Sequence, residues 1–247
     1  VPVFSEYLVK NKNELFKVVN IVFNLLFIIL CLITLLGIFF SPFIIKLIAP
    51  GFIKDSQKLN LTILLSRIMF PYLVFIGLTA YAIGILNTFK AFAVPAFGPS
   101  LLNISLIIFA LISCYFSNPI VVLAWGVLMG GILQLVIQIL YVYKKGFRFK
   151  LFEINLKHPA VNKIIHLLTP RIFGSAIYQL NVFMDTVFAS FSHIVGEGAV
   201  AAIYYANRLI QFPLAVFGIA LSTASLPVMS EQVAIQDIEE LKRTVSF

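Results

Sequence analysis

Charged residues are scarce in this sequence, and their scarcity excludes most soluble folds. Only 11% of the 247 residues are Asp, Glu, Lys or Arg, whereas 61% are hydrophobic and the mean hydropathy is +1.03. Soluble globular domains carry about 25% charged residues. A water-soluble chain of this length could not hide so much apolar surface, so the composition predicts an integral membrane protein.

Residues that perform catalysis are equally scarce. The three histidines (His158, His166 and His193) are scattered, and they form no metal-binding spacing with Cys31 or Cys114. The sequence contains no phosphate-binding Gly-rich loop, no nucleophile elbow and no zinc-protease motif. We therefore expect a protein that is not an enzyme and carries no cofactor. If it moves a substrate, a gradient or the membrane potential supplies the energy.

Long uncharged tracts indicate membrane-spanning helices. They run from Val18 to Ile45, from Ile68 to Phe89, from Ala91 to Tyr143 and from Leu209 to Ser230. A spanning helix needs about 20 apolar residues. Asn118-Pro119 divides the longest tract, because proline disfavours helix at the residue before it. The tracts are continuous rather than alternating, which favours helices over a β-barrel.

We predict an all-α, polytopic membrane protein, a helix bundle with six spans. The expected spans are roughly 18–47, 64–87, 97–116, 119–143, 164–192 and 199–229. The expected connections include 49–60, 90–100 and the basic segment 144–159.

Lysine and arginine are distributed unevenly between the two sides that these spans define. Twelve lie on the side of the N-terminus and of the basic segment 144–163, and four lie on the other side. Cytoplasmic loops carry the excess of positive charge, so the N-terminus and residues 144–163 are predicted to be cytoplasmic. The basic residues are dispersed over loops beside membrane spans. They therefore indicate anionic membrane lipids as a partner and argue against nucleic acid.

Arg208 is the only formal charge in the sixth predicted span. Tyr204, Arg208 and Gln211 recur at steps of four and three on one helical face. Smaller residues continue that face at Ala215, Gly218, Ser222 and Ser225. A cation is costly at the bilayer centre, so such a residue usually faces a wet cavity or a partner. The alternative is that Arg208 snorkels to the interface from a helix end.

Two charges also share one face of the fifth predicted span. Arg171 and Asp185 are fourteen residues apart on a face that includes Ser175, Tyr178 and Asn181. That separation is roughly 21 Å along a helix, so the two charges cannot pair within it. Arg171 lies near the cytoplasmic end, where an interfacial role is the alternative. Asp185 lies deeper and is the stronger functional candidate.

Small residues recur at helical spacing in the second and fourth predicted spans, at Gly77, Ala80, Gly84, Gly126 and Gly130. Gln134 and Gln138 continue the stripe in the fourth span. Small faces let helices approach closely, and amides bridge between them, so we interpret these stripes as helix-packing faces. Pro71 and Pro213 are expected to kink their helices.

Five stretches carry a resemblance to a known family. They are APGF (49–52), GILNTFKAFAVPAFGPSLLNIS (84–105), LAWGVLMGGILQLVIQ (123–138), DTVFASF (185–191) and YYANRLIQFPLAVFGIALSTASLPVMS (204–230). They resemble signatures of the MurJ (MviN) lipid II flippases, within the multidrug/oligosaccharidyl-lipid/polysaccharide exporter superfamily. The resemblance runs nearly end to end and keeps the order of the motifs.

The resemblance implies a two-lobe flippase fold, of which this chain holds the third to eighth helices. Residues 1–143 would form the last four helices of the N-terminal lobe, and 144–163 a cytoplasmic linker between the lobes. Residues 164–247 would form the first two helices of the C-terminal lobe and a following cytoplasmic segment. The chain begins at VPVFSEY and stops at LKRTVSF within a polar segment. We therefore expect a piece of a longer protein, whose remaining helices are its partners.

The function implied by the resemblance is transport of lipid II. Such a flippase carries the undecaprenyl-pyrophosphate-linked peptidoglycan precursor from the inner to the outer leaflet of the bacterial cytoplasmic (inner) membrane, by alternating access. Related superfamily members export undecaprenyl-linked polysaccharide or cationic drugs. A drug exporter should prefer acidic residues where this chain has Arg171 and Arg208. A third hypothesis is an inactive, truncated product or a membrane scaffold.

Arg208 matches a cavity arginine of the family in the motif Y-Y-A-[DN]-R-L, and the resemblance implies that it binds pyrophosphate. A guanidinium makes bidentate contacts with phosphate oxygens and stays charged. Arg171, Asn207 and Gln211 are the further substrate-binding candidates. Asp185 matches a carboxylate that helps to bind sodium in some members. Many relatives have Asp in place of Asn207 and Glu in place of Gln211, so this chain lacks those partners for Arg208.

The predicted orientation can be tested with an impermeant thiol reagent on intact cells. We expect a single cysteine at Lys58, in the outward connection, to be labelled and one at Lys157, in the cytoplasmic segment, to be protected. Equal labelling of both positions, or labelling at Lys157 alone, would refute the orientation.

Overall fold

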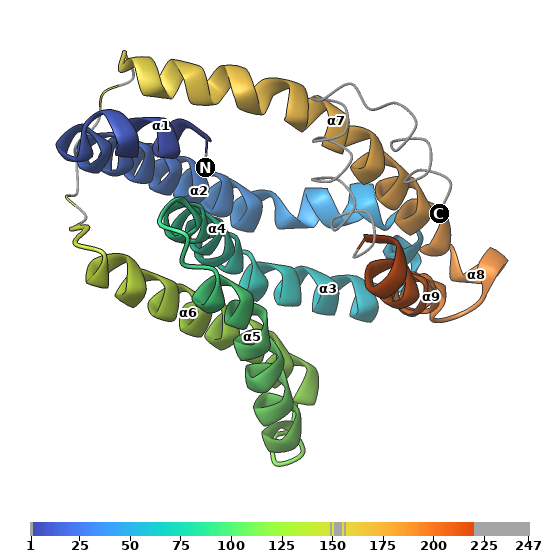
Figure 1. Ribbon diagram of the computed structural model, residues 1–247. Helices are drawn as coiled ribbons and strands as arrows, with labels where there is room; N and C mark the ends of the chain where they lie inside the picture. Colours follow the sequence, from blue (N-terminus) through green and yellow to red (C-terminus); the bar gives the residue numbers. More distant parts are fainter. Residues whose placement is uncertain (1, 149, 151–154, 156, 220–247) are drawn as a thin grey trace, which may run out of the picture. The chain divides into compact units, whose positions relative to one another are not determined.

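The computed structural model describes residues 2–148, 150, 155 and 157–219 (Figure 1). Every regular element in these ranges is helical, which confirms the predicted all-α fold. The chain divides into two compact units, Val1–Val187 and Phe188–Phe247. The assignment of 1–143, 144–163 and 164–247 to lobes and linker stays a prediction, and the cytoplasmic segment expected after the sixth span lies outside the described residues.

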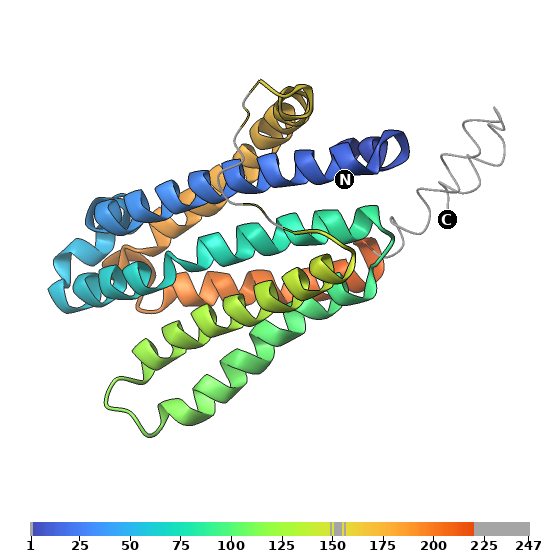
Figure 2. The same ribbon diagram turned by 90° about the vertical axis from the view of Figure 1, so that its left-hand side faces the viewer.

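The first unit contains most of the described helices. They are α1 (Pro2–Lys10), α2 (Lys12–Ile48), the short η1 (Pro50–Lys54), α3 (Ser56–Met69), α4 (Tyr72–Thr88), α5 (Ala93–Ser113), α6 (Pro119–Lys144) and α7 (Pro159–Ala189), whose last residues enter the second unit. Helix α6 packs on both α4 and α5, and α2 packs on α1, α3 and α4. The close pairing of α5 with α6 can be followed in Figures 1 and 2.

In the second unit, α8 (Ser192–Val195) precedes α9 (Ala199–Pro213), which continues into the π-helical turn η2 (Leu214–Ile219). Pro213 has no N–H to donate, and the wider turn follows it directly. The predicted sixth span, 199–229, is therefore helical as far as residue 219. Its remaining residues, including Ser222 and Ser225, lie outside the described part of the chain.

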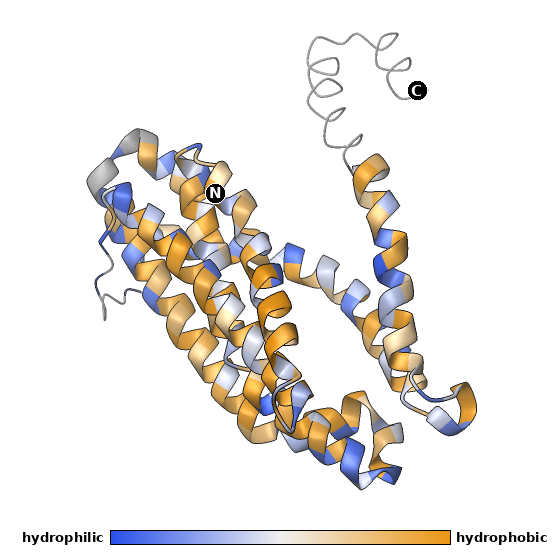
Figure 3. Cartoon of the chain, turned by 90° about the horizontal axis from the view of Figure 1, so that it is seen from below, coloured by the Kyte–Doolittle hydropathy of each residue, from blue (hydrophilic) through white to orange (hydrophobic). Residues whose placement is uncertain are grey.

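Five helical segments of the described ranges are long and apolar enough to cross a membrane. They are Glu14–Ile48, Ser56–Thr88, Ala93–Ser113, Pro119–Lys144 and Ala199–Phe217. Hydrophobic residues predominate along the long helices of the first unit (Figure 3). The protein is therefore a multi-pass membrane protein. Four of the six predicted spans are confirmed, and the sixth is confirmed as far as residue 217. The fifth, 164–192, is helical as far as Ala189 but is not among these segments, since polar residues such as Arg171 and Asp185 lower its mean hydropathy.

Two predicted connections were too long, because helices start earlier than hydropathy alone indicates. Helix α3 begins at Ser56, inside the expected connection 49–60. The Asp55 side chain caps it by accepting hydrogen bonds from the backbone N–H groups of Gln57 (3.1 Å) and Lys58 (3.0 Å). Helix α5 begins at Ala93, inside the expected connection 90–100, because a proline is tolerated in a first helical turn.

The core of the first unit joins α1, α2, α4, α6 and the two ends of the α6–α7 connection. Its buried members are Val3, Phe4, Leu15, Val18, Val19, Ala82, Ile85, Leu86, Val142, Phe147 and Ala160. Helix α1, which hydropathy did not predict, contributes Val3 and Phe4 to this core. A second cluster lies further along α2 and α4, around Phe23, Leu30 and Leu78. Between the two clusters, the Tyr81 hydroxyl donates to the Val19 carbonyl (2.6 Å).

Close helix approaches confirm the packing role of most of the predicted small residues. A Cβ built on Gly126 would lie 2.7 Å from the Phe109 Cβ, and one on Gly77 would lie 2.6 Å from Leu30 Cδ1. The amide of Gln138 bridges helices as expected, because its Nε2 donates to the carbonyl of Val94 on α5 (3.0 Å). Gly84 and Ala80 are exceptions, because nothing lies within 4 Å of a Cβ built on Gly84 and Ala80 is exposed.

Replacing Gly130 by alanine tests the α5–α6 contact. An added Cβ would lie 2.6 Å from Leu102 Cδ1 and 3.0 Å from the Leu102 Cα, so backbone must move as well as side chain. We expect Gly130→Ala to destabilise the bundle by about 1–3 kcal/mol, measured by thermal unfolding in detergent. Gly84→Ala is the matched control and should be neutral or stabilising by about 0.5–1 kcal/mol. Equal effects of the two variants would contradict this packing.

Candidate functional site

Glycine geometry determines where the helix that carries Arg208 begins. Gly196 and Gly198 have φ values of +90° and +80°, in the left-handed region that residues with a side chain avoid. They form the turn between α8 and α9, so that α9 starts at Ala199. Arg208 therefore lies nine residues after the first residue of α9, with a helical turn on each side of it.

Arg208 is held by a tyrosine one helical turn earlier. Its Nε and Nη2 atoms donate to the Tyr204 hydroxyl at 3.2 and 3.1 Å, and its Cζ lies 5.3 Å from the centre of the Tyr204 ring. The Tyr205 ring meets the Tyr204 ring edge to face at 5.8 Å. A guanidinium has five N–H donors. The contact with Tyr204 orients Arg208 but uses two of them, which leaves three for another acceptor.

Asn207 and Gln211 lie beside Arg208 on α9, and all three side chains are exposed. The structure confirms that this segment is helical and that Tyr204 and Arg208 are in contact. A binding role for this face stays a prediction. Glu197 is the only carboxylate in 188–219, and no ion pair with Arg208 occurs in this range. The exposed face of α9 thus carries one permanent positive charge among neutral polar groups.

Arg171 and Asp185 lie on α7, in the first unit, and both side chains are exposed. Leu168, Arg171, Ile172, Ser175, Ala176 and Gln179 line a hollow of about 500 Å³ on this helix. Fourteen residues separate Arg171 from Asp185, so the structure does not bring them together. The predicted site residues thus form two groups, one on each unit.

Asp185 has no cluster of further carboxylate, histidine or cysteine ligands around it in the described residues. A hard cation needs several oxygen ligands. Among residues 2–148, 150, 155 and 157–219, no group of three or more His, Cys, Asp or Glu side chains could hold a metal ion. Asp185 can offer its carboxylate as one ligand, and the remaining ligands would have to come from elsewhere.

Sequence reasoning missed a second polar arrangement, at a proline of α2. Pro42 lacks the N–H that would bond to the Ile38 carbonyl. The buried Ser41 hydroxyl donates to that carbonyl instead (3.0 Å), and Arg67 Nε on α3 donates to the Ser41 oxygen (2.9 Å). Arg67 is one of the four basic residues counted on the non-cytoplasmic side, although it lies within the predicted span 64–87. Its position eleven residues into the Ser56–Thr88 segment, with Ser-Pro on a neighbouring helix, was the available signal.

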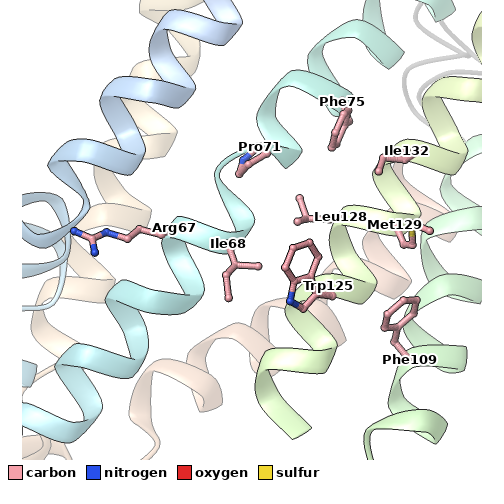
Figure 4. A pocket seen from close by; sticks show the side chains of 9 residues that line it. All are labelled: Arg67, Ile68, Pro71, Phe75, Phe109, Trp125, Leu128, Met129 and Ile132. Atoms are coloured by element: carbon pink, nitrogen blue, oxygen red, sulfur yellow. The ribbon is translucent and has the colours of Figure 1, made fainter. Parts of the chain in front are cut away.

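An apolar pocket of about 710 Å³ lies beside Arg67 (Figure 4). Its other lining residues come from α3 to α6: Ile68, Pro71, Phe75, Phe109, Trp125, Leu128, Met129 and Ile132. The guanidinium of Arg67 points toward α2, away from the apolar side chains in Figure 4. The pocket lining therefore provides apolar contacts, whereas the guanidinium of Arg67 hydrogen-bonds Ser41 between α2 and α3.

Comparison with known proteins identifies the family. The sequence model described as "Lipid II flippase MurJ" matches residues 1–247. The chain belongs to the MurJ lipid II flippase family. A "Probable lipid II flippase MurJ" of Buchnera aphidicola subsp. Acyrthosiphon pisum is 37% identical over 225 residues, which are 90% of this chain and 43% of that protein.

Two further relatives agree with this assignment. The "Lipid II flippase MurJ" of Burkholderia cenocepacia is 36% identical over 246 residues, 97% of this chain and 47% of the relative. A "Probable lipid II flippase MurJ" of Rickettsia prowazekii is 36% identical over 238 residues, 96% of this chain and 46% of the relative. The chain spans about half the length of the curated MurJ relatives that it matches.

Removing the Ser41 hydroxyl tests the arrangement at Pro42. Ser41→Ala leaves the Ile38 carbonyl and Arg67 Nε without their partner, so we expect a loss of about 1–3 kcal/mol in thermal unfolding. Ser66→Ala is the matched control, since the Ser66 hydroxyl only bonds back to Thr62 on its own helix (2.8 Å). It should change stability by about 0.5 kcal/mol or less. A Ser41 variant as stable as the Ser66 variant would contradict the account.

Proposed function

We propose that the protein is a lipid II flippase of the bacterial cytoplasmic membrane. It moves the undecaprenyl-pyrophosphate-linked peptidoglycan precursor between leaflets by alternating access, which is transport rather than catalysis. The observation that carries this proposal is the match to the MurJ family over the whole chain. The family relatives named above are called lipid II flippases, and none is called a polysaccharide or drug exporter.

The chemistry of Arg208 supports pyrophosphate as the group that this chain recognises. Its three remaining N–H donors form part of a planar fork that matches the spacing of phosphate oxygens. The Tyr204 hydroxyl fixes the guanidinium on the exposed face of α9, so less rotamer freedom is lost when an anion binds. Asn207 and Gln211 supply neutral donors on the same helix without competing negative charge. Arg171, on α7, is a second cationic contact for the substrate.

Alternating access moves parts of a transporter relative to one another. Helix α9 has a place to bend near Arg208. Pro213 lies five residues after Arg208 and is followed by the π-helical turn η2. Irregular turns of this kind allow a helix to change direction without breaking its other hydrogen bonds. The part of α9 that carries Arg208 can therefore tilt relative to the residues that follow it.

Substitution of Arg208 tests the proposed pyrophosphate contact in the complete open reading frame. A charge-assisted hydrogen bond contributes about 1.5–3 kcal/mol, so Arg208→Ala should weaken substrate binding roughly ten- to hundredfold. We expect it not to support growth of a flippase-depleted strain at normal membrane abundance. Arg208→Lys should restore little, because lysine keeps the charge but loses the planar fork.

Arg148→Ala is the control for charge, since it removes one exposed cation from the α6–α7 connection and should support growth. Normal growth with Arg208→Ala at normal abundance would overturn the proposal. Full growth with Arg208→Lys but none with Arg208→Ala would show that only positive potential is required. If Arg208 were a snorkelling anchor, both variants would be active.

We also propose that Asp185 contributes a ligand to a sodium ion that drives transport, with its co-ligands outside the described residues. Asp185→Asn should then lower transport and abolish its dependence on sodium. The measurement is growth support, or substrate translocation in vesicles, with and without a sodium gradient. Unchanged transport and an unchanged ion response would leave Asp185 as a structural carboxylate.

A further inference from the structure

Two buried amides of α2 hold the backbone of one residue from a distant part of the chain. The Asn20 Oδ1 accepts a hydrogen bond from the Lys150 N–H (3.1 Å), and the Asn24 Nδ2 donates to the Lys150 carbonyl (2.8 Å). Asn20 and Asn24 are 6% and 3% exposed. They are one helical turn apart, so both amides project from the same face of α2. Together they satisfy both polar groups of one peptide residue, as a neighbouring β-strand would.

The hydrogen-bond partners fix the orientation of both amides. Asn24 Nδ2 also donates to the Asn20 carbonyl (2.8 Å), so it contacts two acceptors and must be nitrogen. Asn20 Oδ1 faces an N–H and must be oxygen. Burying an amide without hydrogen-bond partners costs free energy. The state in which Asn20 and Asn24 bind the Lys150 backbone is therefore favoured over one in which they do not. The contact uses only backbone atoms of Lys150, whose side chain is exposed.

An aromatic anchor precedes this contact in the connection between α6 and α7. Phe147 is 2% exposed and meets the rings of Phe16 and Phe89 edge to face, at 4.5 and 5.5 Å between ring centres. Phe16 lies on α2 and Phe89 follows α4. The connection is thus fixed to the helix bundle by a buried ring and, three residues later, by a pair of amides.

The start of α7 is fixed to the same unit through α1. Lys163 forms an ion pair with Glu6, and the ring of His158 lies 6.2 Å from the ring of Tyr7. Ala160 and Val161 are buried, and Ala160 belongs to the core that contains α1. Residues further along α7 are mostly exposed. The contacts of α7 with the first unit are therefore concentrated at its beginning.

We infer that Asn20 and Asn24 form a docking site for the α6–α7 connection, and that they are positioning residues for transport. Phe147, Lys150 and the first turns of α7 move with the bundle of α1, α2 and α4. The start of α7 is thereby expected to keep its place on that bundle during transport. The role in transport rests on the proposed function, whereas the docking does not.

Hydrogen exchange of the Lys150 amide tests the docking in the complete protein in lipid nanodiscs. We expect Asn20→Ala with Asn24→Ala to raise its exchange rate about tenfold, because a native hydrogen bond is lost. Lys150→Ala is the matched control and should leave that rate unchanged, since the contact uses the backbone. Lys150→Pro removes the N–H donor without altering a residue of the helix bundle, and it serves as a second variant that lacks this hydrogen bond. Unchanged exchange in α5 and α6 shows that the bundle is folded.

Growth of a flippase-depleted strain tests the positioning role. We expect the Asn20/Asn24 double variant and Lys150→Pro to lose growth support at normal abundance, and Lys150→Ala to keep it. Unchanged exchange at Lys150 in the double variant would overturn the docking. Faster exchange with full growth support would overturn the positioning role. If the wild-type protein itself gave no growth support, the proposed function would fail, while the exchange result would still decide the docking.

Discussion

The hydrocarbon interior offers no partner to a polar group, and the hydrogen bonds around Pro42 fit that constraint. Pro42 deprives the Ile38 carbonyl of its helical partner, and the Ser41 hydroxyl replaces it. Arg67 then finds an acceptor in the same hydroxyl. Such chains of hydrogen bonds let a membrane helix contain a proline and a neighbouring cation. They also join α2 to α3, because the hydroxyl that bonds to the Ile38 carbonyl also accepts a hydrogen bond from Arg67.

Arg208 differs from these polar groups because its partner satisfies it only in part. Arg67 Nε is bound to a buried serine of another helix, whereas Arg208 contacts Tyr204 of its own helix and keeps three N–H donors. Asn20 and Asn24 bind a backbone rather than a ligand. The polar groups of the first unit are thus used in structural contacts, whereas Arg208 on α9 keeps donors for another acceptor.

Hydropathy and helical spacing predicted much of the fold, because a spanning helix must show a long uncharged tract whatever it packs against. The same signal failed for α1, whose nine residues are too few to span, and for the start of α3, which depends on the Asp55 cap. The spacing of Tyr204, Arg208 and Gln211 was enough to predict that they lie on one side of a helix. The contact of Arg208 with Tyr204 and the Arg67–Ser41 contact could not be predicted in this way, since they depend on rotamers and on which helices are neighbours. Docking of Lys150 joins residues 126 and 130 positions apart, which no local pattern indicates.

The central claim is that the guanidinium of Arg208 recognises a pyrophosphate. The most direct test is to measure binding of a lipid pyrophosphate to the protein. Undecaprenyl pyrophosphate and undecaprenol share the lipid chain but differ in the anion. Binding of each to the complete, purified protein can be compared by native mass spectrometry, with wild type and Arg208→Ala. The account predicts that wild type prefers the pyrophosphate by at least about tenfold and that the variant loses most of this preference. Equal binding of both lipids by wild type, or an undiminished preference in Arg208→Ala, would contradict it.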